Sequence, residues 1–180
     1  MNCFGLVHSS VKIFPQAKII ARDGTLSIRE YSQIDDFAFV NAGSRLAIGK
    51  FVHISSFCSI IGGGECELMD FCGLSAGCRI VTGSDDFSGG YLTNPTVSPE
   101  FKNVQLGRVV VGRHAVLGSN VVVMPGVSIG DGATVGAGSI VTKDLDAWTV
   151  YVGFSPRKIG ERDCAAVLAR EADFLATFHG

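Results

Sequence analysis

Aliphatic residues recur at every sixth position through most of this chain. In the second half the series is unbroken and runs through Val111, Leu117, Val123, Ile129, Val135 and Val141. An α-helix places apolar residues about 3.6 positions apart, and a single half-buried strand places them two apart. A period of six fits neither element, so the pattern predicts short strands that are joined by tight turns and repeated.

The first half carries the same phase with a few extra residues between groups of three. These groups are Val7, Ile13 and Ile19, then Ile28, Ile34 and Val40, then Ile48, Ile54 and Ile60, then Leu68, Leu74 and Ile80. Two further groups in the second half make six triplets, and three strands per triplet form one triangular coil. Coils of this kind stack about 4.8 Å apart, the spacing of paired strands. A single coil cannot bury its apolar residues, so stacking supplies the core. The sequence therefore predicts an all-β fold, a parallel β-helix of about six coils.

Two segments leave the six-residue pattern. Residues 84–107 have no in-phase aliphatic series and are predicted to form an extruded loop, which at this length is usually functional. After residue 160, Ala165, Leu168, Ala172 and Leu175 follow helical spacing. We therefore expect a β-helix domain over residues 1–160 with the loop at 84–107, and a C-terminal α-helix within residues 161–180. The helix is expected to cap the open end of the coil stack.

Composition excludes several classes of protein. The chain is 47% hydrophobic and 18% charged, which is not the composition of a disordered protein. Its net charge of −2 gives no field that would attract nucleic acid or anionic lipid. It has no apolar run of about 18 residues that could span a bilayer, and its start does not resemble a secretory signal. We expect a cytoplasmic protein with no membrane span.

The six cysteines form no CxxC pair. They indicate reduced thiols rather than a disulfide framework or a zinc site, so no metal is expected. Cys66, Cys72 and Cys78 are six apart, which could suggest a ladder of metal ligands. Each lies two residues before an in-phase aliphatic, so we predict that they point inward as small core residues.

The most specific stretch is "VVVGRHAVLGSNVVVMPGVSIGDGATVGAGSIVTKDLDAWTVYVGFSPRKI", residues 109–159. It resembles the C-terminal block of hexapeptide-repeat acyltransferases that use acetyl-CoA, with "PGV", "VTKD" and a variant "GFSPRKI" ending. The resemblance implies a left-handed β-helix, although ordinary crossover rules favour the right hand. It also implies a homotrimer with sites between subunits and acetyl-CoA as the co-substrate.

Coenzyme A is long and thin and ends in phosphates, which suits a groove lined by backbone amides and closed by cations. Glycine lets a backbone approach such a ligand closely, and lysine and arginine bind phosphate. The candidate contacts are Gly118, Ser119, Gly136, Ala137, Lys143, Arg157 and Lys158. The alternative for the three cations is an ordinary solvated surface near the end of the chain.

Acyl transfer to a hydroxyl or an amine needs a proton acceptor, and histidine suits this role near neutral pH. Val52 and Ile54 are predicted to point inward, so His53 lies mid-strand and points outward. "IGKFVHIS" also resembles an "IGxxxHxS" stretch of nucleotide-sugar N-acetyltransferases. We expect His53 to be the catalytic base and to face a neighbouring subunit. The alternative is an interface histidine without chemistry, and His114 is expected at a turn with little chance of a role.

Two carboxylates are candidates for orienting His53. Asp35 and Asp36 are predicted to stack under Ser55 and Ser56, one coil of about 20 residues further on, which places a carboxylate near the imidazole. Asp35 is also a candidate for binding the substrate, and Asp36 is a candidate for the catalytic set. The alternative is that these are turn aspartates that accept hydrogen bonds from backbone amides.

The interrupting loop is the candidate acceptor site. Tyr91 and Asn94 suit a sugar, whose C–H face stacks on an aromatic ring and whose hydroxyls form hydrogen bonds. In the resembling maltose- and galactoside-type acetyltransferases a "TxxHP" histidine is the base, and here Asp85 or Asp86 stands near that place. Both aspartates therefore remain alternative bases, or ligands for a cationic amine.

The loop stretch "DDFSGGYLTNPTV" resembles acetyltransferases associated with bacterial surface-polysaccharide genes. The resulting prediction is an acetyl-CoA-dependent acetyltransferase that acts on a sugar hydroxyl or amino group. The acceptor is expected to be a nucleotide-linked sugar used for lipopolysaccharide O-antigen or capsule. Two alternatives stay open: a non-catalytic hexapeptide-repeat structural or binding protein, and an acyltransferase for a small molecule that is not a sugar.

Overall fold

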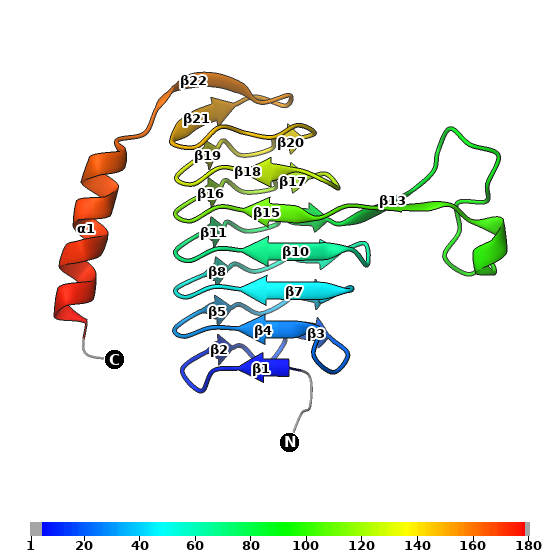
Figure 1. Cartoon of the computed structure of the whole chain (residues 1–180), viewed down its shortest axis with the longest axis horizontal. Helices are drawn as coiled ribbons and strands as arrows, with labels where there is room; N and C mark the ends of the chain where they lie inside the picture. The colour runs from blue at the N-terminus through cyan, green and yellow to red at the C-terminus, as the bar shows by residue number, and fades with distance from the viewer. Residues whose placement is uncertain (1–4, 179–180) are drawn as a thin grey trace.

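A computed structural model of the chain describes residues 5–178. Short strands wind into triangular coils that stack into a column, and each side of the triangle is a parallel sheet (Figure 1). The first and third sheets have six strands each, and the second has seven parallel strands and one antiparallel strand. The prediction of a left-handed parallel β-helix is confirmed, with six complete coils and the start of a seventh.

The strands of the three sheets alternate along the chain. The first sheet contains β1 (Gly5–Val7), β4 (Leu26–Ile28), β7 (Arg45–Ile48), β10 (Glu65–Leu68), β15 (Val109–Val111) and β18 (Ser128–Ile129). The second contains β2 (Lys12–Ile13), β5 (Gln33–Ile34), β8 (His53–Ile54), β11 (Gly73–Leu74), β16 (Val116–Leu117), β19 (Thr134–Val135), β21 (Thr149–Val152) and β22 (Arg157–Glu161). The third contains β3 (Lys18–Ile20), β6 (Phe39–Asn41), β9 (Ser59–Ile61), β12 (Arg79–Val81), β17 (Val122–Val123) and β20 (Ile140–Val141).

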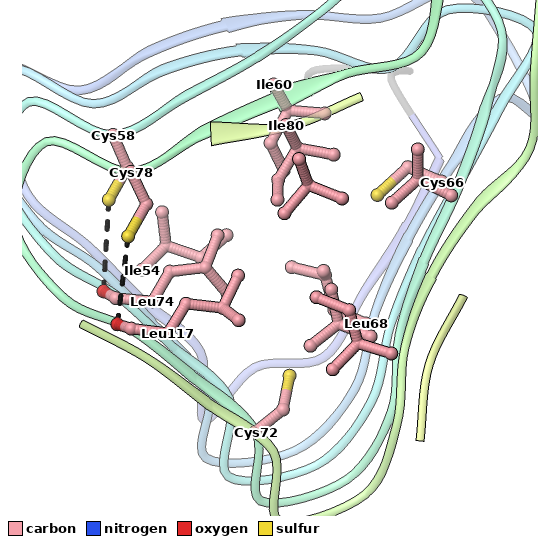
Figure 2. Close-up of a cluster of buried hydrophobic side chains, with 14 of the residues drawn as sticks. Ile54, Cys58, Ile60, Cys66, Leu68, Cys72, Leu74, Cys78, Ile80 and Leu117 are labelled. Atoms are coloured by element: carbon pink, nitrogen blue, oxygen red, sulfur yellow. Dashed lines mark hydrogen bonds between the residues drawn. The ribbon is translucent and has the colours of Figure 1, made fainter. Parts of the chain in front are cut away.

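The core is a set of ladders of inward side chains, because the strand register places each in-phase aliphatic on the one below it. Ile34 pairs with Ile54 in the second sheet, and Ile60 pairs with Ile80 in the third. All four side chains are at most 1% exposed. Figure 2 shows these ladders meeting inside the triangle. Burial of stacked apolar surface therefore holds adjacent coils together.

The four cysteines of the repeat, Cys58, Cys66, Cys72 and Cys78, are buried in this core, as predicted. The thiols of Cys58 and Cys78 lie 3.8 and 3.7 Å from the carbonyl oxygens of Leu74 and Leu117 (Figure 2). Cys66 is buried as well, and its burial raises the pKa of the thiol to about 12. Cys66 is therefore a small, unreactive core group at neutral pH.

One corner of the column, between the first and second sheets, carries a row of ring side chains that we call the aromatic ladder: Tyr31, Phe51, Phe71 and His114. Each occupies the same turn position in successive coils with a left-handed backbone, at φ between 54° and 62°. Such a conformation is unfavourable for a residue with a side chain. Stacking offsets this cost, since successive ring centroids are 5.2, 4.8 and 5.0 Å apart.

The C-terminal helix α1 (Cys164–Thr177) packs along this ladder on the side of the column (Figure 1). Phe174 meets Phe51 and Phe71 edge-on, at centroid distances of 5.2 and 6.2 Å. The expectation that the helix caps the open end of the stack is wrong. The β21–β22 hairpin lies at that end, and the ladder offers the helix a longer apolar strip.

The interruption of the repeat forms an extruded loop, as predicted. β13 (Gly83–Asp85) and β14 (Val104–Leu106) pair as antiparallel strands that lead away from the column, and the short helix η1 (Pro99–Phe101) lies beyond them. Figure 1 shows this loop and helix α1 on opposite sides of the column. Among residues 5–178, no helix has the length and apolar character needed to cross a membrane.

Candidate active site

A histidine–carboxylate pair lies on the outer surface of the second sheet. His53 is on β8 with its neighbour Ile54 fully buried, so its side chain points outward, as predicted. Its Nε2 is 3.0 Å from Oδ2 of Asp35, which follows β5 at the next turn. The two side chains are 49% and 22% exposed. Solvent or a ligand can therefore reach the imidazole, while the carboxylate behind it is partly shielded.

Gln33 completes this group. It lies beside His53 in the strand register, and its Nε2 donates to Oδ1 of Asp35 over 2.8 Å. Partial burial raises the pKa of Asp35, but the hydrogen bonds from Gln33 and His53 lower it, and the net pKa lies below the usual value. The carboxylate is thus an anion that can only accept hydrogen bonds. It fixes the proton of His53 on Nε2, which leaves Nδ1 as the proton acceptor.

Sequence reasoning missed Gln33, although a signal was present. Gln33 and His53 are one coil apart and share the outward phase of their strands. Gln33 holds the carboxylate of Asp35, which in turn contacts the imidazole of His53.

Asp36 contacts the backbone rather than His53. Its Oδ1 accepts a hydrogen bond from the backbone N–H of Gln16 over 2.7 Å, one coil below. This is the role of a turn aspartate that satisfies a backbone amide. The geometry therefore favours Asp35 over Asp36 as the partner of His53.

The loop aspartates lie apart from His53 within one chain, because the loop leaves the column between the third and first sheets and His53 is on the second. Asp86 accepts from the backbone N–H groups of Gly89 and Ser88, at 2.8 and 3.0 Å, and from the side chain of Asn103 at 3.0 Å. The donors, led by the Gly89 N–H, lower the pKa of Asp86. These bonds favour a loop-stabilising role for Asp86 over that of a base.

The other loop candidates are open to ligands. Asp85 is half-buried on β13, and Tyr91 is 50% exposed. Asn94 is exposed, and its side-chain oxygen accepts from the backbone N–H and the hydroxyl of Thr96, at 2.9 and 2.8 Å. Its amide donors remain available to a sugar hydroxyl.

The glycines expected to contact coenzyme A lie at one corner of the upper coils. Gly118 with Ser119, and Gly136 with Ala137, occupy the same turn in successive coils at the edge of the second sheet. A Cβ at Gly118 would be 2.6 Å from the backbone nitrogen of Ala137, so the stacking of the coils already requires this glycine. Gly118 therefore gives no independent sign of a ligand.

The three candidate cations are divided between two places. Lys143 and Arg157 line one cavity of about 320 Å³, together with Ser155 and Pro156. Lys158 instead places its Nζ 2.9 Å from Oε1 of Glu161, and this partner raises the pKa of the ammonium group. The structure thus brings Lys143 and Arg157 together and pairs Lys158 with a carboxylate.

His114 lies at a turn, as predicted, but its side chain is buried. Its Nε2 lies 2.9 Å from Oε2 of Glu171 on α1, and Arg113 pairs with the other oxygen of the same carboxylate. Burial raises the pKa of Glu171, but His114 and Arg113 together lower it below the usual value. His114 therefore ties helix α1 to the column. Across residues 5–178, no three His, Cys, Asp or Glu side chains come close enough to hold a metal ion.

Comparison with known proteins defines the class of the molecule. Residues 108–143 match the family model "Hexapeptide repeat of succinyl-transferase". This segment is the upper part of the column, and it contains both glycine turns and Lys143. The match agrees with the resemblance of the same stretch to hexapeptide-repeat transferases.

A curated relative places the whole chain more narrowly. The dTDP-4-amino-4,6-dideoxy-D-glucose acyltransferase of Escherichia coli is 36% identical over 160 residues, which cover 88% of this chain and 83% of that protein. The chain therefore belongs to the hexapeptide-repeat family of sugar acyltransferases. It is an enzyme, which excludes the alternative of a non-catalytic repeat protein.

Solved structures agree with this assignment. AntD, an N-acyltransferase from Bacillus cereus in complex with dTDP and 3-hydroxybutyryl-CoA, is 35% identical with a TM-score of 0.88, over 97% of this chain and 92% of that chain. A variant of AntD in complex with dTDP-4-amino-4,6-dideoxyglucose and coenzyme A is 34% identical with a TM-score of 0.90, over 98% and 93% of the two chains. The polySia-specific acetyltransferase NeuO, at 19% identity and a TM-score of 0.69, shares the fold.

Proposed function

We propose that this enzyme transfers an acyl group from an acyl-CoA to the amino group of a dTDP-linked amino sugar. The observation that carries the proposal is the similarity, over nearly the whole chain, to two acyltransferases. One is named for dTDP-4-amino-4,6-dideoxy-D-glucose, and the other, AntD, is solved with 3-hydroxybutyryl-CoA and, as a variant, with dTDP-4-amino-4,6-dideoxyglucose. The proposal takes the amino alternative over the hydroxyl alternative for the acceptor.

In this proposal His53 is the base. The neutral amine nitrogen of the sugar attacks the thioester carbonyl carbon, and a C–N bond forms. The amine proton passes to Nδ1 of His53, the C–S bond breaks, and the departing thiolate of coenzyme A takes up the proton. Asp35 stabilises the transient imidazolium, since its carboxylate is 3.0 Å from Nε2.

The donor lies on the upper coils. Lys143 and Arg157 would bind the phosphates of coenzyme A, because both line one cavity beside the last coils. Lys158 contributes less in this arrangement, since it is paired with Glu161. Acetyl-CoA is the simplest donor, and the chemistry is the same for a longer acyl chain.

The acceptor site is proposed to lie between subunits of a homotrimer. One chain presents His53 on the second sheet and its loop on the opposite corner, so Asp85, Tyr91 and Asn94 can approach His53 only from a neighbour. An exposed apolar corner supports assembly: Phe37 and Phe57 stack at 5.2 Å and are 53% and 63% exposed. Such rings beside the candidate site are typical of a surface that another subunit covers.

The cellular context also belongs to the proposal. The buried, unpaired thiols of Cys58, Cys66, Cys72 and Cys78 support a reducing, cytoplasmic setting. An N-acylated dTDP-sugar made there is an activated building block, which would suit the synthesis of lipopolysaccharide O-antigen or capsule.

The test is an assay of the purified enzyme with acetyl-CoA and dTDP-4-amino-4,6-dideoxyglucose. We expect release of free coenzyme A, and a product whose mass has increased by one acetyl group in amide linkage. dTDP-6-deoxyglucose, which differs from this substrate only in a hydroxyl at C4 in place of the amine, is the matched control and should give no product. Equal turnover of both sugars would overturn the amino acceptor, and no turnover of either would overturn the proposed function.

A further inference from the structure

The surface beside His53 contains a gap in an otherwise continuous row of side chains. Successive coils of the second sheet present one outward residue each: Lys12, Gln33, His53, Gly73, Val116, Thr134 and Val150. Gly73 is the one member of this row without a side chain. Bare backbone is therefore exposed between His53 and Val116, one strand spacing, about 4.8 Å, from each.

The fold itself does not require glycine at position 73. Its φ is not in the left-handed region that favours glycine, and a Cβ built there would meet no atom within 4 Å. Gly112 and Gly118 are different, because a Cβ at either would come within 2.6 Å of a neighbouring backbone nitrogen. A glycine inside a strand is less stable than alanine by roughly 0.5–1 kcal/mol. A glycine inside a strand often marks a bulge, a tight bend, or a site where a ligand or another backbone approaches closely. The pairing of Gly73 with Val116 and with His53 is regular, which favours close approach.

We propose that the acyl thioester binds against the exposed backbone at Gly73, so that Gly73 determines which acyl groups the enzyme accepts. This inference rests on the proposed function. The candidate donor contacts, Lys143 and Arg157, lie on the coils above, and His53 lies on the coil below. A thioester that extends down from the upper coils passes over Gly73 before it reaches an amine next to His53.

A side chain at position 73 would lift the thioester off the backbone. The reacting carbon and the amine must approach to about 3–3.5 Å, and a displacement of about 1 Å can lower the rate roughly 100-fold. We therefore expect Gly73→Ala to lower kcat/KM by about tenfold and Gly73→Val by about 100-fold. The loss should be greater for the four-carbon 3-hydroxybutyryl group than for acetyl, because the larger group needs more of the same space.

The experiment compares the wild-type enzyme with Gly73→Ala, Gly73→Val and a control, Gly160→Ala. Gly160 lies on β22, where a Cβ would also meet no atom within 4 Å, so the control reports the general effect of removing an open glycine. Each protein is assayed with acetyl-CoA and 3-hydroxybutyryl-CoA at saturating amino sugar. Tm and the mass in solution by light scattering are measured in parallel.

The inference predicts that the Gly73 variants keep their mass and do not fall in Tm, and that they lose kcat/KM in order of side-chain size. The loss should be larger with 3-hydroxybutyryl-CoA, and Gly160→Ala should match the wild type. Three results would overturn it: unchanged kcat/KM in Gly73→Val, an equal loss with both donors, or a change in mass that shows a role in assembly. An inactive wild-type enzyme would instead refute the proposed function, and this inference with it.

Discussion

Replacing Asp35 with asparagine removes the negative charge beside the proposed base, His53. The side chain keeps nearly the same shape. The carboxylate oxygen is 3.0 Å from Nε2 of His53, and both side chains are partly exposed. Two unit charges at that distance interact by about 1.4 kcal/mol even at the dielectric constant of water. This interaction exists only when His53 has taken up the proton, so its loss should lower kcat about tenfold. The KM for acyl-CoA should change little, since Asp35 is far from the candidate phosphate contacts.

The assay is steady-state release of coenzyme A at saturating concentrations of both substrates. Asp36→Asn is the matched control, because this adjacent aspartate contacts the backbone of Gln16 rather than His53. The effect of Asp35→Asn should also disappear in a His53→Ala background, where there is no imidazolium to stabilise. If Asp35→Asn and Asp36→Asn gave the same kcat, or if the Asp35 effect persisted without His53, the reasoning would be refuted.

Three further predictions concern the donor site and the helix. Lys143→Ala should weaken binding of coenzyme A about tenfold in calorimetry. Lys158→Ala should have a smaller effect, because Lys158 already pairs with Glu161. Equal losses of affinity would contradict the assignment of phosphate binding to Lys143 rather than Lys158. Phe174→Ala should lower Tm by a few degrees, because a half-exposed ring that packs on the ladder contributes about 1–2 kcal/mol, and an unchanged Tm would argue against helix docking. The pKa of Glu171 is lowered in the folded state, so its stabilisation is present above the usual carboxyl pKa and is lost as pH falls through the lowered value. Glu171→Gln should therefore reduce Tm at pH 7 but much less at pH 3, and an equal reduction at both would contradict the ion pair.

The coil architecture could be predicted from the sequence because each inward residue is fixed by a local rule. A period of six and a coil of about 20 residues set the strand register, and that register predicts a carboxylate, Asp35 or Asp36, near His53. The structure selects Asp35. The same coil length also places Gln33 one coil below His53. It was missed because outward polar residues are common, and only the hydrogen bond to Asp35 distinguishes this one.

The position of the helix could not be predicted in the same way. The aromatic ladder depends on Tyr31, Phe51 and Phe71 adopting a left-handed backbone, a conformation usually associated with glycine. The rings stack only once the coils are assembled, so no local pattern reveals the apolar strip that receives helix α1. The burial of His114 follows from that docking and was hidden for the same reason.

The loop shows another limit of single-chain reasoning. Asp85 and Asp86 were equivalent candidates in the sequence, and the hydrogen bonds of Asp86 to Ser88, Gly89 and Asn103 separate them in the structure. Whether Tyr91 and Asn94 reach an acceptor depends on a neighbouring subunit. That dependence cannot be read from the order of residues in one chain.

The measurement that tests the central claim most directly is turnover of His53→Ala with acetyl-CoA and dTDP-4-amino-4,6-dideoxyglucose. His8→Ala is the matched control, since His8 bonds only to neighbouring Ser10 among its described side-chain contacts. We predict that kcat falls at least about 100-fold in His53→Ala, the usual scale for loss of a general base. Coenzyme A affinity and Tm should stay close to those of the wild type. Turnover of His53→Ala close to that of His8→Ala would contradict the assignment of His53 as the base.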